Sequence, residues 1–375
     1  MAFFIKDIIN ELEISVPLDL RERWDNSGYQ IKLENEPLNG VLISLDLTST
    51  AVSMAVKKNC NLILIHHPFF FYPVSSLDIN SVDSKIISDL LTNRICVYAM
   101  HTNFDSSFNS MSRYIAEKAG LSDIATLKPG KKRLYKLSVF VPKGYVSTVR
   151  ETLFAFANPK IGNYENCSFE TKGRGSFKPL LGAKPFIGKK EKTSFVEESK
   201  LELIVDENRL GKAVEEMKKV HPYEEVAFDV YPLANCGKNN LEGIGVVGKF
   251  KSPVKLKELL GRLNKLIKPA YINYVGDAGR LLKRAAIISG SGFSLINEVI
   301  RQKIDILISS ECSYDKALKA KKNNLCLIDL PHFDTEKYFI SIVKGILRDK
   351  FSIKIKIVEN NIDINPIINF KGEKA

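Results

Sequence analysis

The chain has 375 residues, enough for about two domains at the usual size of roughly 150 residues each. Apolar residues make up 45% and charged residues 26%, which excludes a chain that is disordered over most of its length. No stretch reaches the roughly 18 consecutive apolar residues of a transmembrane helix, and the first residues do not have the pattern of a signal peptide. The composition therefore predicts a soluble cytoplasmic protein.

The formal net charge is +12, from 55 Lys and Arg against 43 Asp and Glu. The clustered lysines could bind an anionic partner such as nucleic acid, or they could be ordinary solvated faces. No zinc-finger, basic-zipper or RNP-type motif accompanies the charge, so charge alone does not decide the function. The six cysteines form no C-x-x-C pair, which predicts reduced and mostly buried thiols: Cys60, Cys96, Cys167, Cys236, Cys312 and Cys326.

The first third of the chain alternates between helix and strand patterns. Short β-branched runs predict buried strands, and the amphipathic stretches between them predict helices. In chain order we expect a helix over 5–12, a strand over 41–47, a helix over 50–58, a strand over 62–65, a helix over 84–91, a strand over 95–100 and a helix over 110–119. This rhythm predicts a largely parallel sheet covered by helices.

The middle of the chain has a different pattern. It predicts a strand over 137–142, a helix over 146–157, a hairpin over 164–179, a strand over 201–205, a helix over 208–220 and a strand over 226–231. Two β-α-β units with an extra hairpin predict a ferredoxin-like α+β module.

The last third returns to the α/β style. Strands are expected over 285–289, 304–308, 326–329 and 352–359, and helices over 294–302, 314–322 and 336–348. We therefore expect a discontinuous α/β domain over 1–130 and 238–375, interrupted by an inserted module over 131–237. Its two boundaries are expected in the basic stretch 128–136 and in 235–240.

Four of the five histidines lie where a predicted strand ends, which is where ligands gather in an open α/β sheet. His66 and His67 follow the strand over 62–65, and Pro68 ends that strand. Because adjacent side chains of a strand point to opposite faces, this pair suits two ions lying side by side better than one.

Two more strands end in the same way. His101 follows the strand over 95–100, with Asp105 four residues later. His332 and Glu336 are also four residues apart, so one helical turn could bring both side chains to one site. Imidazole and carboxylate together suit zinc, iron or manganese, and a carboxylate such as Glu336 can bridge two ions. Three such motifs predict a dinuclear metal site.

Four further sequence features allow more than one structural or functional interpretation. Asp334 or Thr335 is expected to cap the helix that begins near Glu336. His221 is either a small-molecule contact or the end of a helix packed by Tyr223, and the second interpretation is favoured.

The loop 289–294 (SGSGFS) could bind a phosphate at a helix start, or it could be a turn that needs glycine. The segment 24–30 (WDNSGYQ) is either a polar loop near the metals, through Asp25 and Asn26, or a turn anchored by Trp24.

These motifs occur in a recognisable order: WDNSGYQI, VLISLDLT, LILIHHP, YAMHTNFD, ISGSGFSLINEVI and LIDLPHFDTE. Together they resemble the GTP cyclohydrolase I type 2 homologue family, also called Nif-three-like. The middle of the chain, with HPYEEVAFDVYPL, resembles the inserted module of its longer bacterial members, which is similar to PII and CutA proteins. The resemblance implies a discontinuous Nif-three-like α/β domain, a dinuclear metal site, a toroidal homohexamer and a hydrolase-like architecture.

The resemblance also implies roles for individual residues. The family's metal ligands fall on His66, His67, Asp105, His332 and Glu336. His101 matches a histidine that lies at the site as a ligand or proton donor. This chain departs from the family where members often carry Gly-Asp and then Tyr-His, because it has Ser310-Glu311 and Tyr314-Asp315.

Three functions remain open from the sequence. The first is a hydrolase with two divalent metal ions per subunit that acts on a nucleotide or another phosphorylated small molecule, with His101 shuttling a proton. The second is a non-catalytic metal-binding scaffold or metallochaperone whose insert senses a ligand. The third is a nucleic-acid-binding ring, which a steep salt dependence of binding would reveal.

Overall fold

The structure is a computed structural model that describes residues 3–130, 134–162, 164–234, 242–351, 354–362 and 365–368. The chain divides into two compact units. Unit 1 comprises Met1–Gly130 and Asn239–Ala375, and unit 2 comprises Lys131–Lys238. The expected boundary stretch 235–240 lies outside the described residues, as do residues 131–133 of the other boundary stretch.

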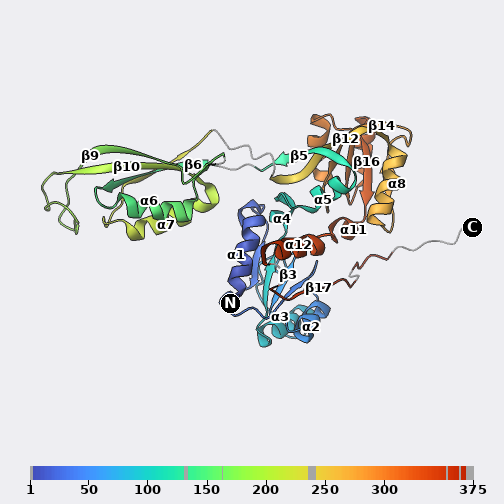
Figure 1. Cartoon of the computed structure of the whole chain (residues 1–375), viewed down its shortest axis with the longest axis horizontal. Helices are drawn as coiled ribbons and strands as arrows, with labels where there is room; N and C mark the ends of the chain where they lie inside the picture. Colours follow the sequence, from blue (N-terminus) through green and yellow to red (C-terminus); the bar gives the residue numbers. More distant parts are fainter. Residues whose placement is uncertain are drawn as a thin grey trace, which may run out of the picture. The chain divides into compact units, whose positions relative to one another are not determined.

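One sheet of unit 1 has the strand order β1-β4-β3-β2-β17 (Figure 1). Four of its strands are parallel: β2 (Val41–Ile43), β3 (Leu62–Ile65), β4 (Cys96–Ala99) and β17 (Ile357–Glu359). β1 (Gly28–Ile31) joins the edge in the antiparallel direction. Helices α2 (Ser49–Lys57) and α3 (Val82–Thr92) make the crossovers, as the sequence predicts.

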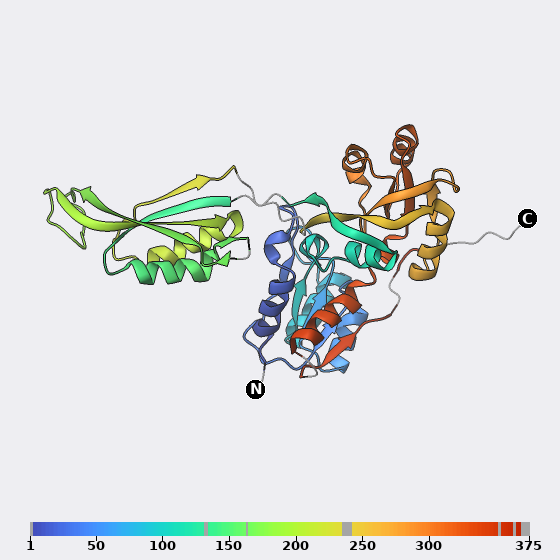
Figure 2. The same ribbon diagram turned by 45° about the horizontal axis from the view of Figure 1, so that its top comes forward.

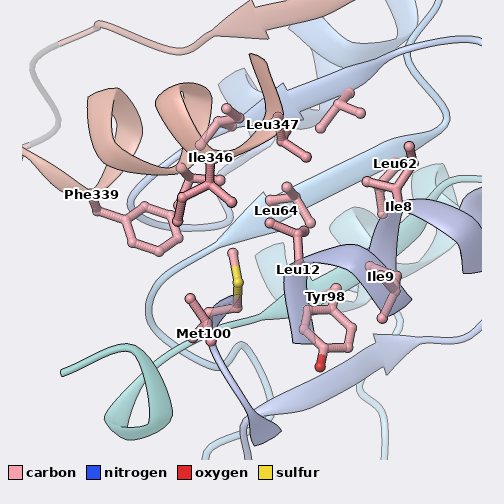
Figure 3. Close-up of a cluster of buried hydrophobic side chains, with 14 of the residues drawn as sticks. Ile8, Ile9, Leu12, Leu62, Leu64, Tyr98, Met100, Phe339, Ile346 and Leu347 are labelled. Atoms are coloured by element: carbon pink, nitrogen blue, oxygen red, sulfur yellow. The ribbon is translucent and has the colours of Figure 1, made fainter. Parts of the chain in front are cut away.

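Alternate side chains of these strands pack into two hydrophobic clusters, one on each face of the sheet. Leu62 and Leu64 face helices α1 (Ile5–Ser15) and α12 (Phe339–Phe351), which come from opposite ends of the chain (Figure 3). Ile63 and Ile65 face the opposite cluster, with α2 and α3. Each buried aliphatic side chain contributes about 1.5–3 kcal/mol, so both faces hold the strand ends firmly in place.

The second sheet of unit 1 has the order β13-β16-β15-β14-β12-β5. Its parallel strands are β14 (Leu281–Ile287), β15 (Ile306–Ser310) and β16 (Cys326–Leu330). β12 (Gly243–Lys255) pairs in the antiparallel direction with both β14 and β5 (Leu121–Pro129), and β13 (Asn273–Val275) pairs antiparallel with β16. β5 and β12 lie side by side although unit 2 separates them in the sequence (Figure 2). The prediction of a largely parallel sheet therefore holds for the first sheet, whereas in the second sheet only the pairings β14-β15 and β15-β16 are parallel.

Helices α8 (Leu256–Ile267), α9 (Ile296–Arg301) and α10 (Tyr314–Lys322) accompany the second sheet. None of the helices formed by the described residues is long and apolar enough to cross a membrane. The cysteines among those residues are free thiols, and Cys60, Cys96 and Cys326 are buried. Cys236 lies outside the described residues.

The single helix predicted over 336–348 is wrong. The chain forms α11 (His332–Glu336) directly after Pro331, and α12 begins only at Phe339. The expected caps have other roles, because Asp334 accepts a hydrogen bond from the Ala270 N–H and Thr335 accepts one from the Gly290 N–H. As a result, His332 and Glu336 are the two ends of one helical turn.

Unit 2 is an antiparallel sheet of order β11-β6-β10-β9, with two helices packed on it. Its main elements are β6 (Leu134–Pro142), α6 (Val146–Ala157), β9 (Ser168–Phe177), β10 (Ser194–Asp206), α7 (Glu207–Val220) and β11 (Phe228–Pro232). The hairpin predicted over 164–179 is wrong, because β9 pairs with β10 rather than within that stretch. A small pair of strands, β7 (Lys160–Ile161) and β8 (Tyr164–Glu165), lies before β9.

His221 ends α7, and its ring is buried within unit 2. Its Nε2 lies 3.1 Å from the Phe140 carbonyl oxygen, and its Nδ1 accepts a hydrogen bond from the Tyr223 N–H. The Tyr223 ring packs against it, with centroids 5.1 Å apart. The interpretation of His221 as a helix-terminating residue packed by Tyr223 is confirmed.

This burial makes the stability of unit 2 depend on pH. Burial lowers the pKa of His221 below its ordinary value of 6.5, because the imidazolium would lose its hydration. As the pH falls through 6.5, the unfolded chain takes up a proton that the folded chain does not, so the free energy of unfolding decreases. We expect amide exchange in β6, corrected for intrinsic rates, to show less protection at about pH 5 than at about pH 8. His221→Gln should abolish that difference; a difference that persists in the variant would contradict this assignment.

Candidate metal centre

Neighbouring parallel strands deliver three histidines to one sheet edge. His66 and His67 follow β3 directly, and His101 lies between β4 and the short helix α4 (Thr102–Ser106). Because β3 and β4 are parallel and paired, their carboxyl ends meet at the same edge. Asp105 lies on α4, so it reaches the same region.

The prediction that His66 and His67 point to opposite faces is wrong. Their ring centroids are 4.7 Å apart, and both Nε2 atoms lie near the Glu336 carboxylate. His66 Nε2 is 3.8 Å from Oε1, and His67 Nε2 is 3.1 Å from Oε2. The alternation of side chains applies only inside a strand, and β3 ends at Ile65. Beyond that residue the loop turns both rings to the same side.

The second sheet supplies the remaining side chains through α11. Glu336 is only 3% exposed, and its Oε2 lies 3.0 Å from His332 Nε2. The Glu336 carboxylate therefore contacts three imidazoles at once. Asp105 completes the group, with its Oδ2 3.9 Å from His66 Nε2.

Two of these buried atoms lack a hydrogen bond in the described structure: His66 Nε2 and Glu336 Oε2. The contacts of Glu336 Oε2 with His67 and His332 are short but are not aligned as hydrogen bonds. Leaving a buried polar atom such as His66 Nε2 without a hydrogen bond is unfavourable by about 1–3 kcal/mol, and a metal ion would satisfy it. This buried group of imidazole nitrogens and carboxylate oxygens therefore fits a divalent cation.

Two groups of three side chains have all their ligand atoms within 4.8 Å of one another. The first is His66, His67 and His101, and the second is His67, His332 and Glu336. The structure thus brings together the residues that the sequence analysis named, with Asp105 beside His66. These groups could hold metal, and the side chains that they offer are nitrogen and oxygen ligands suited to first-row transition metals.

Each histidine of the site is held through its Nδ1 atom. At 2.8 Å in every case, the partners are the Met100 carbonyl oxygen for His66, Asp46 for His67, Asp25 for His101 and Glu311 for His332. Such contacts fix the ring orientation and direct Nε2 toward the centre.

The sequence assigned no contact at the site to Asp46, and Glu311 was named only as a departure from the family pattern. Both lie just beyond a strand, β2 and β15 respectively, so their position at a sheet edge was the available signal. Glu311 is part of the departure from the family pattern, and it holds His332 in place.

Close carboxylates set the protonation of the imidazoles. Burial alone would lower the pKa of His67, but Asp46 and Glu336 raise it to about 10. The pKa of His332 rises to about 9 in the same way, against its burial, because of Glu336 and Glu311. Burial opposes ionisation of Glu336, yet the imidazoles of His332, His66 and His67 hold its pKa well below the usual range. Without a cation His67 and His332 carry protons near neutral pH, so a metal ion must displace these protons to bind.

Asp25 anchors His101 within the segment 24–30. It is 7% exposed and accepts hydrogen bonds from the Ser27 hydroxyl at 2.5 Å and from the Thr102 hydroxyl at 2.6 Å. Burial works against its charge, but the hydrogen bonds from His101, Ser27 and Thr102 hold the pKa of Asp25 well below its usual range. Residues 24–27 form a polar loop beside His101, in agreement with one interpretation of the segment, and residues 28–30 belong to β1. The Trp-anchored turn is wrong, because Trp24 is 60% exposed.

The loop 289–292 is a glycine turn, and its interpretation as a phosphate loop is wrong. Three of its N–H groups already donate to side-chain hydroxyls: Ser289 to Ser112, Gly290 to Thr335 and Gly292 to Ser309. Gly290 has φ +65°, and a Cβ there would lie 2.3 Å from Glu336 Oε1. The turn requires glycine because it passes directly over the Glu336 carboxylate.

The fold and this cluster define an α/β protein with a candidate metal centre at the carboxyl ends of its strands. The family model described as Duf34/NIF3 (NGG1p interacting factor 3) matches residues 3–366. The chain therefore belongs to the DUF34/NIF3 family, and the resemblance seen in the sequence is confirmed.

Relatives and solved structures agree with this assignment. The GTP cyclohydrolase 1 type 2 homolog of Halalkalibacterium halodurans is 34% identical over 364 residues, covering 96% of this chain and 97% of that protein. A Bacillus cereus protein related to NIF3 has 28% identity and a TM-score of 0.75, covering 99% of this chain and 100% of that one. Staphylococcus aureus protein SA1388 has 26% identity and a TM-score of 0.72, covering 98% and 99%.

Proposed function

We propose that this protein is a metal-dependent hydrolase with two divalent metal ions per subunit. The observation that carries the proposal is the buried Glu336 carboxylate among three imidazoles, with His66 Nε2 lacking a hydrogen bond to any described residue. The ligands would be His66, His67, Asp105, His332 and Glu336. Glu336 suits a bridge because its two oxygens face different histidines.

Bound divalent ions would lower the pKa of a water molecule toward about 7 and polarise an oxygen of the substrate. The chain supplies the proton transfer. His101 is held through Nδ1 by the ionised Asp25, which leaves Nε2 to accept a proton from the attacking water and return it to the leaving group. The substrate would be a nucleotide or another phosphorylated small molecule.

Two structural proposals accompany this function. We propose that unit 2 is a ferredoxin-like module, because its strands follow the order fourth, first, third, second with a helix in each β-α-β unit. We also propose the toroidal homohexamer that the family resemblance implies, which sedimentation of the full chain would test.

Elemental analysis of protein purified without chelators or affinity-tag metal tests the metal proposal. Close to two transition-metal ions per chain is expected, together with hydrolysis of at least one member of a panel of nucleotides and phosphoesters. Failure to take up added zinc, iron or manganese would overturn the metal site. Full occupancy without turnover would favour a metal-binding scaffold, and binding of nucleic acid with a steep salt dependence would favour the basic-ring alternative.

Asp25→Asn separates proton transfer from metal binding. The amide cannot hold the Nδ1–H of His101 as the carboxylate does, so we expect kcat to fall by about 100-fold or more while the metal content stays the same. Kinetics on an active substrate and elemental analysis of the same sample provide the two measurements. Asp315→Asn, at an exposed carboxylate, is the matched control. If kcat is unchanged in Asp25→Asn, His101 does not transfer the proton. If the variant loses metal, His101 is a metal ligand instead.

A further inference from the structure

Exposed aromatic side chains gather beside His101. Trp24 is 60% exposed, Phe71 39% and Tyr72 77%. The ring centroid of His101 is 6.0 Å from that of Trp24 and 6.3 Å from that of Phe71, and the Trp24 and Phe71 centroids are 5.9 Å apart. This aromatic cluster therefore adjoins the candidate centre directly.

The cluster lines a pocket of about 500 Å³, together with Asp25, Asn26 and residues 70–74. Ligand sites for small molecules usually measure about 300–1,000 Å³, so this pocket has the size for one compact ligand. Its walls combine aromatic faces with the polar side chain of Asn26, whereas the Asp25 side chain is fully buried against His101, and such a mostly aromatic lining with a polar group is typical of ligand sites.

Hydrogen bonds hold the two walls of the pocket together. Asn26 Nδ2 donates to the Phe70 carbonyl oxygen at 2.6 Å, and the Phe70 N–H donates to Gln30 Oε1 at 3.0 Å. Gln30 Nε2 in turn donates to the Asn26 carbonyl oxygen at 2.8 Å. This closed set of bonds fixes the loop of Trp24 against the loop of Phe71. The aromatic faces are therefore preformed, which lowers the entropy that a ligand loses on binding.

From these observations we propose that the pocket is a subsite for a planar heteroaromatic ring, such as a nucleobase, that packs against Trp24 and Phe71, whose ring planes are inclined by 50° to one another. A ring bound there lies next to His101, so the rest of the ligand reaches the candidate metal residues. The inference rests on the proposed hydrolase function and narrows its substrates to compounds that carry such a ring. It also assigns a role to the segment 24–30, which both forms the pocket and anchors His101.

Trp24 is the only tryptophan of the chain, so its fluorescence reports on this pocket. We expect guanosine and uridine to quench it saturably in metal-free and in zinc-loaded full-length protein, whereas ribose 5-phosphate should not. Free N-acetyltryptophanamide corrects for the inner-filter effect. Phe71→Leu should weaken guanosine binding by about five- to 150-fold, the usual contribution of one aromatic stacking partner. Tyr274→Leu, at an exposed aromatic residue of β13, should leave binding unchanged.

Circular dichroism of Phe71→Leu establishes that the variant is folded. Absence of quenching by both nucleosides, or unchanged affinity in the folded variant, would overturn the ring subsite. Emission that changes with protein concentration and not with nucleosides would show that a second copy covers the pocket, which also overturns it. Nucleoside binding without any hydrolysis would leave the ring subsite standing and overturn the hydrolase. Hydrolysis of ring-free phosphoesters without nucleoside binding would do the reverse.

Discussion

Replacing Glu336 by Ala is expected to remove metal from both positions while the chain stays folded. The Glu336 carboxylate lies within 3.8 Å of the Nε2 atoms of His66, His67 and His332, so its loss removes the oxygen donor that these three histidines share. The fold should survive because alanine favours the helical conformation of α11, and none of the four apolar clusters of unit 1 includes this residue.

Elemental analysis after dialysis measures the effect, with an expected decrease from about two ions per chain to nearly none. Glu258→Ala provides the matched control, since it removes an exposed glutamate from α8 in the same unit. Thermal unfolding followed by circular dichroism checks that the Glu336 variant is folded. Full metal occupancy in a folded Glu336→Ala protein would contradict the bridging role of this carboxylate.

The second large effect is expected at Gly290, where no ligand atom is altered. An added Cβ would lie 2.3 Å from Glu336 Oε1 and 3.3 Å from His332 Nε2, so Gly290→Ala must displace the carboxylate. The φ of +65° adds a backbone penalty of about 1–2 kcal/mol for a residue with a Cβ. We expect metal affinity to fall by about 10- to 100-fold, the usual effect of disturbing the surroundings of a ligand.

Competition with a chromogenic chelator measures the affinity of this variant, and urea unfolding measures its stability. Gly261→Ala is the control, because Gly261 lies in α8 with open space around its Cβ position. That change should leave metal affinity unaltered and should stabilise the helix by up to about 1 kcal/mol. Equal metal affinity in the Gly290 and Gly261 variants would show that the turn does not shape the centre.

Much of the fold was predictable because it is encoded by local patterns. The helix α6 (Val146–Ala157) has the boundaries that its periodicity predicts, and β3 (Leu62–Ile65) coincides with a continuous apolar run. The strand β12 (Gly243–Lys255) was missed because its glycines and its proline resemble turn signals. Its partner β5 (Leu121–Pro129) precedes the inserted unit, so their pairing has no local signature.

The sequence by itself determined which chemistry is present: histidines at the ends of three strands, with Asp105 and Glu336 four residues beyond two of them. Strand ends are predictable because hydrophobic periodicity is a property of neighbouring residues. Only the tertiary structure decided that His66 and His67 converge, because their directions depend on the loop after β3. It also decided that Asp25 meets His101 across 76 positions of the sequence and that Trp24 meets Phe71 in one pocket. Such contacts arise when separate elements pack together, so they cannot be predicted from the residues that are adjacent in the sequence.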